Sequence, residues 1–109
     1  MREFVVHYEI RREQARPGLF DELVACMDDL VVPLHQDKGM TVVGTFVDAD
    51  GGFLWLRRFA DDAEREAVVD AVHRDPRWLR EIGPAVRALL AEDGSTTTTL
   101  SPTARSALR

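Results

Sequence analysis

The chain has 109 residues, of which 45% are hydrophobic and 30% charged, and its formal net charge is −5. This size and composition are typical of one globular domain with a small core. The negative charge argues against a general binder of nucleic-acid backbones, which needs a basic face, and it gives no reason to expect binding to a membrane surface. A single cysteine, Cys26, excludes an internal disulfide, and the N-terminus lacks a signal-peptide pattern. We therefore expect a cytoplasmic protein.

The first two predicted elements are a strand and a helix. Residues 3–10 alternate as a strand does, with Tyr8 and His7 on opposite faces, and the charged residues 11–16 are predicted as a loop. Residues 19–36 have a helical apolar pattern. The stripe expected to face the core consists of Leu19, Leu23, Cys26, Leu30 and Leu34, and it is broadened by Phe20, Val24, Met27 and Val31. Pro33 is expected to kink or end this helix near Val32, because proline cannot continue the hydrogen-bond ladder.

The middle of the chain predicts a hairpin followed by a capped helix. Residues 40–47 and 53–59 are β-prone, and the Asp-Gly turn between them is typical of a tight connection. Asp61 and Glu64 then have capping-box spacing, and Asp75 before a proline has the pattern of a second helix start.

The end of the chain predicts the close of this helical region and a last strand. The apolar pattern is interrupted at Gly83-Pro84, and Asp93-Gly94 is expected to end it. Residues 96–100 are β-prone, with a disordered tail as the alternative. The order is β-α-β-β-α-β, a ferredoxin-like α+β domain over residues 1–100, with a C-terminal tail at 101–109.

The strand at residues 53–59 is largely apolar on both faces. One face carries Phe53, Trp55, Arg57 and Phe59, and the other carries Leu54, Leu56 and Arg58. Two helices can cover only one face of a four-stranded sheet, so the second would remain an exposed apolar patch. We therefore expect a homodimer in which the same face of a second copy covers it.

These residues also carry a family resemblance. The segment 53–59, Arg65-Glu66, Asp75-Pro76 and Trp78, in that order and spacing, resemble the core signature of bacterial NIPSNAP-like proteins. Further positions that agree are Tyr8, Pro17-Gly18, Val32-Pro33-Leu34 and residues 100–106. Two departures are Val6, where the family commonly has arginine, and Ala104-Arg105, where it commonly has Pro-Phe. The resemblance covers nearly the whole chain and implies a dimeric α/β barrel.

Proteins with this barrel include cofactor-free aromatic monooxygenases, cyclases and isomerases, haem-handling enzymes and ligand-sensing modules. The resemblance therefore implies a small-molecule enzyme without metal or nucleotide cofactor, acting in bacterial secondary metabolism. Its substrate would be a hydrophobic or aromatic metabolite with an enolisable or phenolic oxygen. The reaction would be cyclisation, isomerisation or cofactor-free oxygenation. The alternative is a non-catalytic homodimer that binds a metabolite or a protein partner.

Three residues are the candidates for catalysis. His7 is the candidate general base, because histidine titrates near neutral pH. Arg57 and Tyr8 are the candidates for stabilising negative charge on the ligand. Each also has a plain structural interpretation, as a hydrogen-bonded histidine, an ion-paired arginine and a core tyrosine. The carboxylates that Arg57 would then meet are Glu3, Glu9 or Glu66.

Four residues are the candidates for substrate binding. Trp55 and Phe59 would form flat walls of a pocket, or else belong to the core. His35 lies near a helix end, where it would either interact with the helix dipole or face the pocket. Trp78 would pack the last helix onto the domain or line the pocket. The three histidines are far apart and no Cys-x-x-Cys or Gly-rich phosphate loop is present, so no metal or nucleotide site is expected.

Overall fold

The computed structural model of the chain describes residues 5–109. Its elements are β1 (His7–Ala15), α1 (Phe20–Cys26), η1 (Met27–Val31), α2 (Val32–Asp37), β2 (Thr41–Val47), β3 (Gly52–Phe59), α3 (Asp62–Arg74), η2 (Trp78–Ile82), α4 (Gly83–Leu89) and β4 (Leu90–Leu100), where η marks a π-helical segment. The predicted α+β, ferredoxin-like arrangement is confirmed. Residues 3 and 4 of the predicted first strand lie outside the described part.

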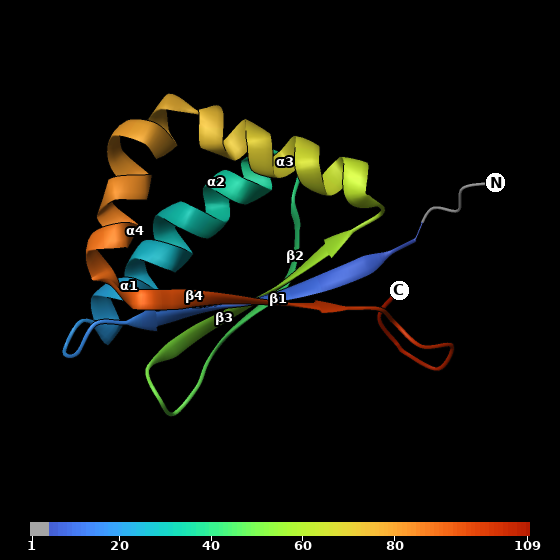
Figure 1. Cartoon of the computed structure of the whole chain (residues 1–109), viewed down its shortest axis with the longest axis horizontal. Coiled ribbons are helices and arrows are strands. Elements are labelled where there is room, and N and C mark those ends of the chain that lie inside the picture. The colour runs from blue at the N-terminus through green and yellow to red at the C-terminus, as the bar shows by residue number, and fades with distance from the viewer. Residues whose placement is uncertain (1–4) are drawn as a thin grey trace.

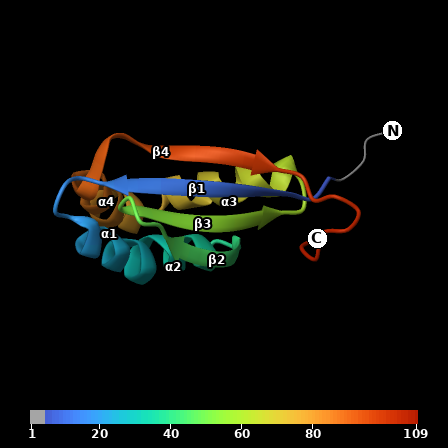
Figure 2. The ribbon, with the colours of Figure 1, turned by 90° about the horizontal axis from the view of Figure 1, so that it is seen from below.

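The four strands form one antiparallel sheet in the order β2-β3-β1-β4. Figure 1 shows the helices together on one side of this sheet, and Figure 2 shows the four strands side by side with the helices behind them. The sheet therefore has a covered face, under the helices, and an open face. The side chains that β1 and β3 direct to the covered face are His7, Glu9, Arg11, Glu13, Phe53, Trp55, Arg57 and Phe59.

The first strand is longer than its sequence indicates. The predicted loop at residues 11–16 was wrong, because β1 continues to Ala15 and pairs with both β3 and β4. This part of the strand is charged on both faces, so it lacks the apolar alternation that marks a strand. Its buried charge, Glu13, is accommodated because Arg11 and Trp55 donate hydrogen bonds to its carboxylate.

The first helix is continuous from α1 through η1 to α2, so of the two outcomes expected near Val32, a kink or an end, the end was wrong. The N–H of Val32 donates to the carbonyl of Met27, five residues back. This wider turn comes directly before Pro33, whose ring would collide with a carbonyl in an α-helical ladder. A π turn holds one residue more than an α turn, so it rotates every later side chain around the helix axis.

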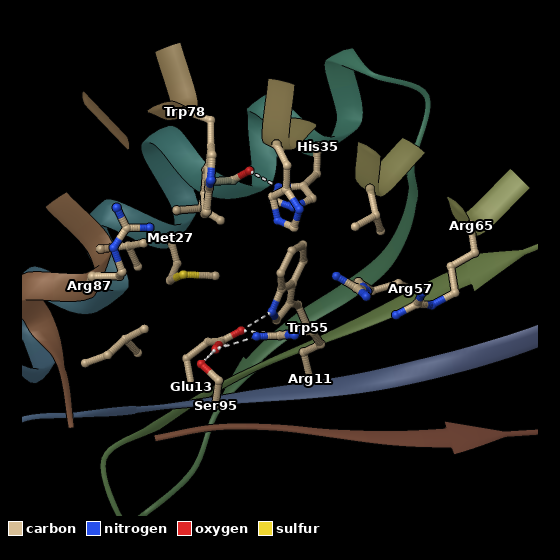
Figure 3. A pocket seen from close by; sticks show the side chains of 15 residues that line it. Arg11, Glu13, Met27, His35, Trp55, Arg57, Arg65, Trp78, Arg87 and Ser95 are labelled. Carbon is tan, nitrogen blue, oxygen red and sulfur yellow. Dashed lines mark hydrogen bonds and ion pairs between the residues drawn. The ribbon is translucent and has the colours of Figure 1, made fainter. Parts of the chain in front are cut away.

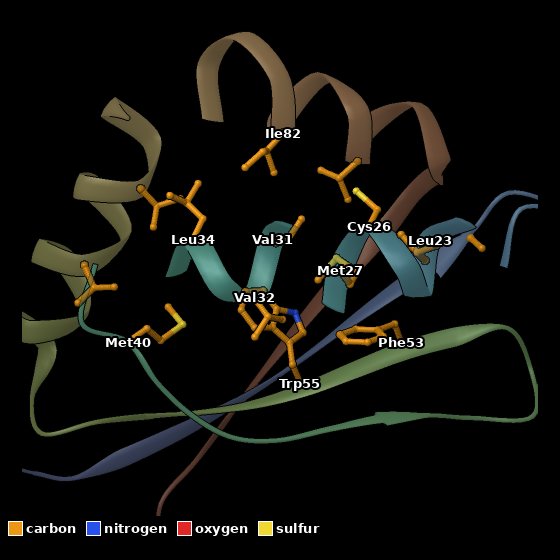
Figure 4. Packing of buried hydrophobic residues seen from close by; sticks show 14 of the residues in the cluster. Leu23, Cys26, Met27, Val31, Val32, Leu34, Met40, Phe53, Trp55 and Ile82 are labelled. Carbon is orange, nitrogen blue, oxygen red and sulfur yellow. The ribbon is translucent and has the colours of Figure 1, made fainter. Parts of the chain in front are cut away.

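This rotation decides which side chains of the first helix face the sheet. Leu30, which the predicted stripe directs inward, is 44% exposed, whereas Val31, at the edge of that stripe, and His35, outside it, are buried. Figure 4 shows the resulting core, with Leu23, Met27 and Val31 of the first helix above Phe53 of β3. The wide turn thus brings His35 over the covered face.

The two helix starts predicted for the second helical region, at Asp61 and Asp75, are confirmed. The side chain of Asp61 accepts a hydrogen bond from the N–H of Glu64 at 2.8 Å, which caps α3. The carboxylate of Asp75 accepts one from the N–H of Arg77 at 2.7 Å, which caps the helix that begins after it. Within residues 5–109, no helix has the length and the apolar character to cross a membrane.

The end of this region differs from the prediction. The helix ends at Leu89, and β4 begins at Leu90, so the predicted helix end at Asp93-Gly94 and strand start at residue 96 were wrong. Asp93 has a φ of 53° and lies where the pairing of β1 with β4 shifts register. A bulge of this kind lets the strand bend there and continue.

The open face of the sheet is apolar and partly uncovered. Phe46 of β2 is 57% exposed, and Leu54 and Leu56 of β3 are half-buried beside it. At one end of this face the tail returns to the sheet, where the Nε of Arg58 donates to the backbone oxygen of Arg109 at 2.6 Å. Much of the open face therefore lacks a covering layer within the described chain.

Candidate functional site

A cavity of about 380 Å³ lies between the covered face and the helices. Figure 3 shows its side chains converging from three directions: Trp55 and Arg57 rise from β3, His35 and Met27 descend from the first helix, and Trp78 descends from the second. The floor comes from strand alternation and the roof from the two helices with π-helical segments. Such segments are frequent at functional sites in proteins.

Aromatic rings form much of the cavity wall. The ring of His35 lies edge-on to Trp55, with centroids 4.9 Å apart, and edge-on to Trp78, with centroids 6.0 Å apart. The exposed ring of His73, on α3, lies 5.6 Å from Trp78. Flat aromatic walls are typical of a small-molecule pocket, and this cavity adds four arginines, Arg11, Arg57, Arg65 and Arg87, to its lining.

His35 is held as a neutral imidazole. Its Nδ1 lies 2.7 Å from the carbonyl oxygen of Val31, and because a carbonyl can only accept, Nδ1 carries the hydrogen. Burial lowers the pKa of His35 to about 4, so the ring is uncharged at neutral pH. With the hydrogen on Nδ1, Nε2 is the hydrogen-bond acceptor of the ring.

Arg57 provides a buried positive charge with an unused donor. It is 3% exposed, it pairs with Glu9 in register across the sheet, and its guanidinium lies 4.9 Å from the centre of the Trp55 ring. Glu9 also accepts a hydrogen bond from Arg65 at 2.6 Å, so one carboxylate serves two arginines. The Nε of Arg57 is buried and has no hydrogen-bond partner among the described residues. A buried donor left unpaired is costly, which favours a ligand that accepts from it.

A second polar network fixes the floor of the cavity. The carboxylate of Glu13 accepts hydrogen bonds from Trp55 Nε1 at 2.8 Å, from Arg11 Nε at 3.2 Å, and from the hydroxyl of Ser95. These donors keep the pKa of Glu13 below its usual value although burial opposes this. Trp55 is therefore locked in one orientation by its own ring nitrogen.

The structure brings together four of the seven predicted site residues. Trp55, Arg57, His35 and Trp78 all line the cavity. Phe59 is fully buried in the core beside them, and the guanidinium of Arg57 lies 5.6 Å from its ring centre.

His7 and Tyr8 lie elsewhere. His7 is on the covered face but lines a separate, open recess, where its Nε2 is 3.9 Å from Asp62. Arg65 lines both this recess and the cavity. Tyr8 points to the opposite face of the sheet and is buried there. His7 and Arg57 thus do not share one cavity, and the side chain of Tyr8 lies on the other face of the sheet from both.

Several cavity residues were missed by the sequence analysis. Arg11 and Glu13 were assigned to a loop, although their i, i+2 spacing with Glu9 could have shown a shared strand face. Arg87 and Ser95 enter the cavity from α4 and β4, and no local signal marks them. Within residues 5–109, no group of three or more His, Cys, Asp or Glu side chains is placed to bind a metal ion.

Comparisons with known proteins agree with this architecture. A NIPSNAP family protein from Agrobacterium tumefaciens superposes with a TM-score of 0.86 at 20% identity, covering 95% of this chain and 99% of the other. An NIPSNAP domain protein from Burkholderia xenovorans gives 0.81 at 16%, covering 92% and 97%. A structure described as an antibiotic biosynthesis monooxygenase gives 0.62 at 18%, covering 89% and 98%. No curated protein matches the sequence.

The family comparison is more specific than these superpositions, which show the fold alone. The NIPSNAP family model matches residues 8–107, which include all the cavity-lining residues of β1, β3 and β4 and of both helical regions. The chain therefore belongs to the NIPSNAP family.

Proposed function

We propose that this protein is an enzyme that binds a small hydrophobic or aromatic metabolite with an enolisable or phenolic oxygen and removes a proton from it. The observation that carries the proposal is the unpartnered Nε of Arg57, buried at the wall of an aromatic cavity. An oxygen that gains negative charge would accept from this nitrogen and balance a buried positive charge. The flat rings of Trp55 and Trp78 suit a planar ligand.

His35 replaces His7 as the group that accepts the proton in this proposal, because His35 lines the same cavity as Arg57. The proton would leave the substrate oxygen or carbon and bind to Nε2, while the electron pair stays on the substrate. An imidazole with a pKa of about 4 is a weak base. It matches only an acidic proton, such as that of an activated phenol or a 1,3-dicarbonyl compound.

The fate of the deprotonated substrate defines three reaction classes. Return of the proton to a different atom would be an isomerisation, and attack of the carbanion on a carbonyl within the same molecule would be a cyclisation. Reaction of the carbanion with dioxygen would be an oxygenation, with dioxygen as the oxidant. The similarity in fold to an antibiotic biosynthesis monooxygenase supports including oxygenation among the proposed reactions.

A non-catalytic binding protein is the alternative. In that case Arg57 and the neutral His35 would donate to and accept from a ligand that is released unchanged. The open apolar face of the sheet would additionally serve in partner binding. Binding experiments do not separate the two functions, whereas proton exchange does.

The first test is binding of a panel of substituted phenols and cyclic 1,3-diketones, followed by tryptophan fluorescence and calorimetry. Arg57→Gln should weaken binding at least tenfold. Arg58→Gln is the matched control, because Arg58 is adjacent in β3 but points to the open face. Equal affinities of the two variants would contradict the proposed site.

The second test addresses catalysis. The wild-type protein should accelerate exchange of the acidic carbon-bound hydrogen of a bound diketone with deuterium oxide, observed by NMR. His35→Gln should abolish the acceleration, and His7→Gln should leave it unchanged. Binding without any acceleration would favour the non-catalytic alternative.

A further inference from the structure

Four arginines line the cavity, and three of them have a carboxylate partner. Arg11 pairs with Glu13, and Arg57 and Arg65 share Glu9. The fourth, Arg87 on α4, makes no ion pair and no side-chain hydrogen bond with the described residues. The cavity therefore carries more positive than negative charge, although the whole chain has a net charge of −5. A local surplus of this sign attracts an anionic ligand.

A glycine one helical turn earlier brings Arg87 to the cavity. A side chain at Gly83 would place its Cβ 3.2 Å from Nη1 of Arg87 and 3.1 Å from Cε2 of Trp78. The same Cβ would lie 2.8 Å from the backbone oxygen of Trp78, which is too close to be tolerated without a shift. Because Gly83 has no side chain, the guanidinium of Arg87 and the indole of Trp78 can both lie close to the helix there.

Arg87 and Arg57 lie at opposite sides of the cavity, with Met27, Trp55 and Trp78 between them (Figure 3). Arg57 is buried, whereas Arg87 is exposed. A ligand that reaches both arginines therefore has one end in the interior and the other near solvent. The apolar side chains between them fit the body of such a ligand.

We propose that Arg87 forms a second subsite, for a carboxylate, and that the substrate is an elongated aromatic acid. Its acidic oxygen would bind at Arg57 and His35, its ring between Trp55 and Trp78, and its carboxylate at Arg87. This inference rests on the proposed function and adds the substrate class. Arginine suits this role because its planar guanidinium can donate two parallel hydrogen bonds to a carboxylate.

The test compares 3-(4-hydroxy-3-nitrophenyl)propanoate, an activated phenol, with its amide, which has nearly the same shape and no charge at that end. We expect the wild-type protein to bind the acid roughly threefold to tenfold more tightly than the amide at low ionic strength. Arg87→Gln should remove this preference and leave the affinity for the amide unchanged. Gly83→Ala should reduce the preference as well, because it displaces the guanidinium.

Arg80→Gln is the matched control, since Arg80 is an exposed arginine of the same helical region that does not line the cavity. This variant loses the same charge and should keep the preference for the acid. If the wild type binds both compounds equally in an Arg57-dependent manner, the second subsite is overturned and the proposed function stands. If neither compound binds at millimolar concentration, both are overturned. An equal loss of preference in Arg80→Gln would also overturn the subsite, because the effect would then be one of overall charge.

Discussion

Glu9 and Arg57 face each other in register across β1 and β3, and their side chains form an ion pair on the covered face of the sheet. Both are almost fully buried, and Arg65 adds a second cation to the same carboxylate. Removing two charges from water costs about as much as their attraction returns, so the pair need not stabilise the fold. It does fix Arg57 in place, and Nε of Arg57 keeps no hydrogen-bond partner among the described residues.

Breaking this pair should be costly, because it leaves a buried charge without a partner. We expect Glu9→Gln to lower the free energy of unfolding by roughly 3–5 kcal/mol, measured by urea denaturation. The double variant Glu9→Leu/Arg57→Leu should lose less than the sum of the two single variants, since it leaves neither charge behind. Glu66→Gln, on the exposed side of α3, is the control and should change little. A loss below about 1 kcal/mol in Glu9→Gln would contradict a buried, coupled pair.

We expect His35 to make the free energy of unfolding depend on pH between about 4 and 6.5. Its pKa is lowered from 6.5 to about 4 by burial, so the unfolded chain takes up a proton at a higher pH than the folded chain does. The free energy of unfolding should therefore be fully maintained above pH 6.5 and fall by roughly 3 kcal/mol as the pH drops to 4. The lowered pKa values of Glu9 and Glu13 act only from their usual 4.5 downward.

Denaturation of His35→Gln between pH 4.5 and 6.5 checks this assignment. The slope of stability against pH in that window should be largely lost in this variant. His73→Gln, which removes an exposed histidine from α3, should keep it. A slope that survives in His35→Gln would assign the titration to another group.

The features that the sequence predicted correctly depend on neighbouring residues. Strand alternation alone places Trp55 and Arg57 on one face, because side chains in a strand alternate with a period of two. The caps at Asp61 and Asp75 are also local, since each involves a hydrogen bond within three residues. Local sequence patterns therefore predicted the strand face that forms the floor of the cavity and the start of the helix that carries Trp78.

The features that the sequence missed depend on pairing and on helix phase. Glu13 lies in a strand because β3 and β4 pair with it and provide donors for its carboxylate, and neither partner is near in sequence. His35 faces the cavity because the π turn before Pro33 rotates the helix, whereas a regular helical pattern directs Leu30 inward. A proline in a helical pattern therefore signals a change of phase as well as an end.

Trp55 should matter for stability through its ring nitrogen as well as its size. Trp55→Phe removes one hydrogen-bond donor from the buried carboxylate of Glu13. The carboxylate still accepts hydrogen bonds from Arg11 and Ser95. We expect a loss of about 1–3 kcal/mol in the free energy of unfolding. Trp78→Phe is the matched control, because its ring nitrogen has no hydrogen-bond partner within residues 5–109 and the side chain is half-buried. Similar losses in the two variants would show that packing alone is responsible.

We propose that the open face of the sheet pairs with the same face of a second copy, because this would cover its exposed apolar side chains. Phe46 lies on this face with its ring over Gly44, where an added Cβ would be 2.8 Å from the ring. Phe46→Glu should convert a dimer into a monomer in sedimentation experiments at micromolar concentration, because it places a charge in the apolar contact. Leu79→Glu is the matched control: Leu79 is as exposed, at 59%, but lies in η2 on the far side of the molecule. A wild-type protein that sediments as a folded monomer at this concentration would refute the dimer, and dissociation by Leu79→Glu would place the contact on the helices instead.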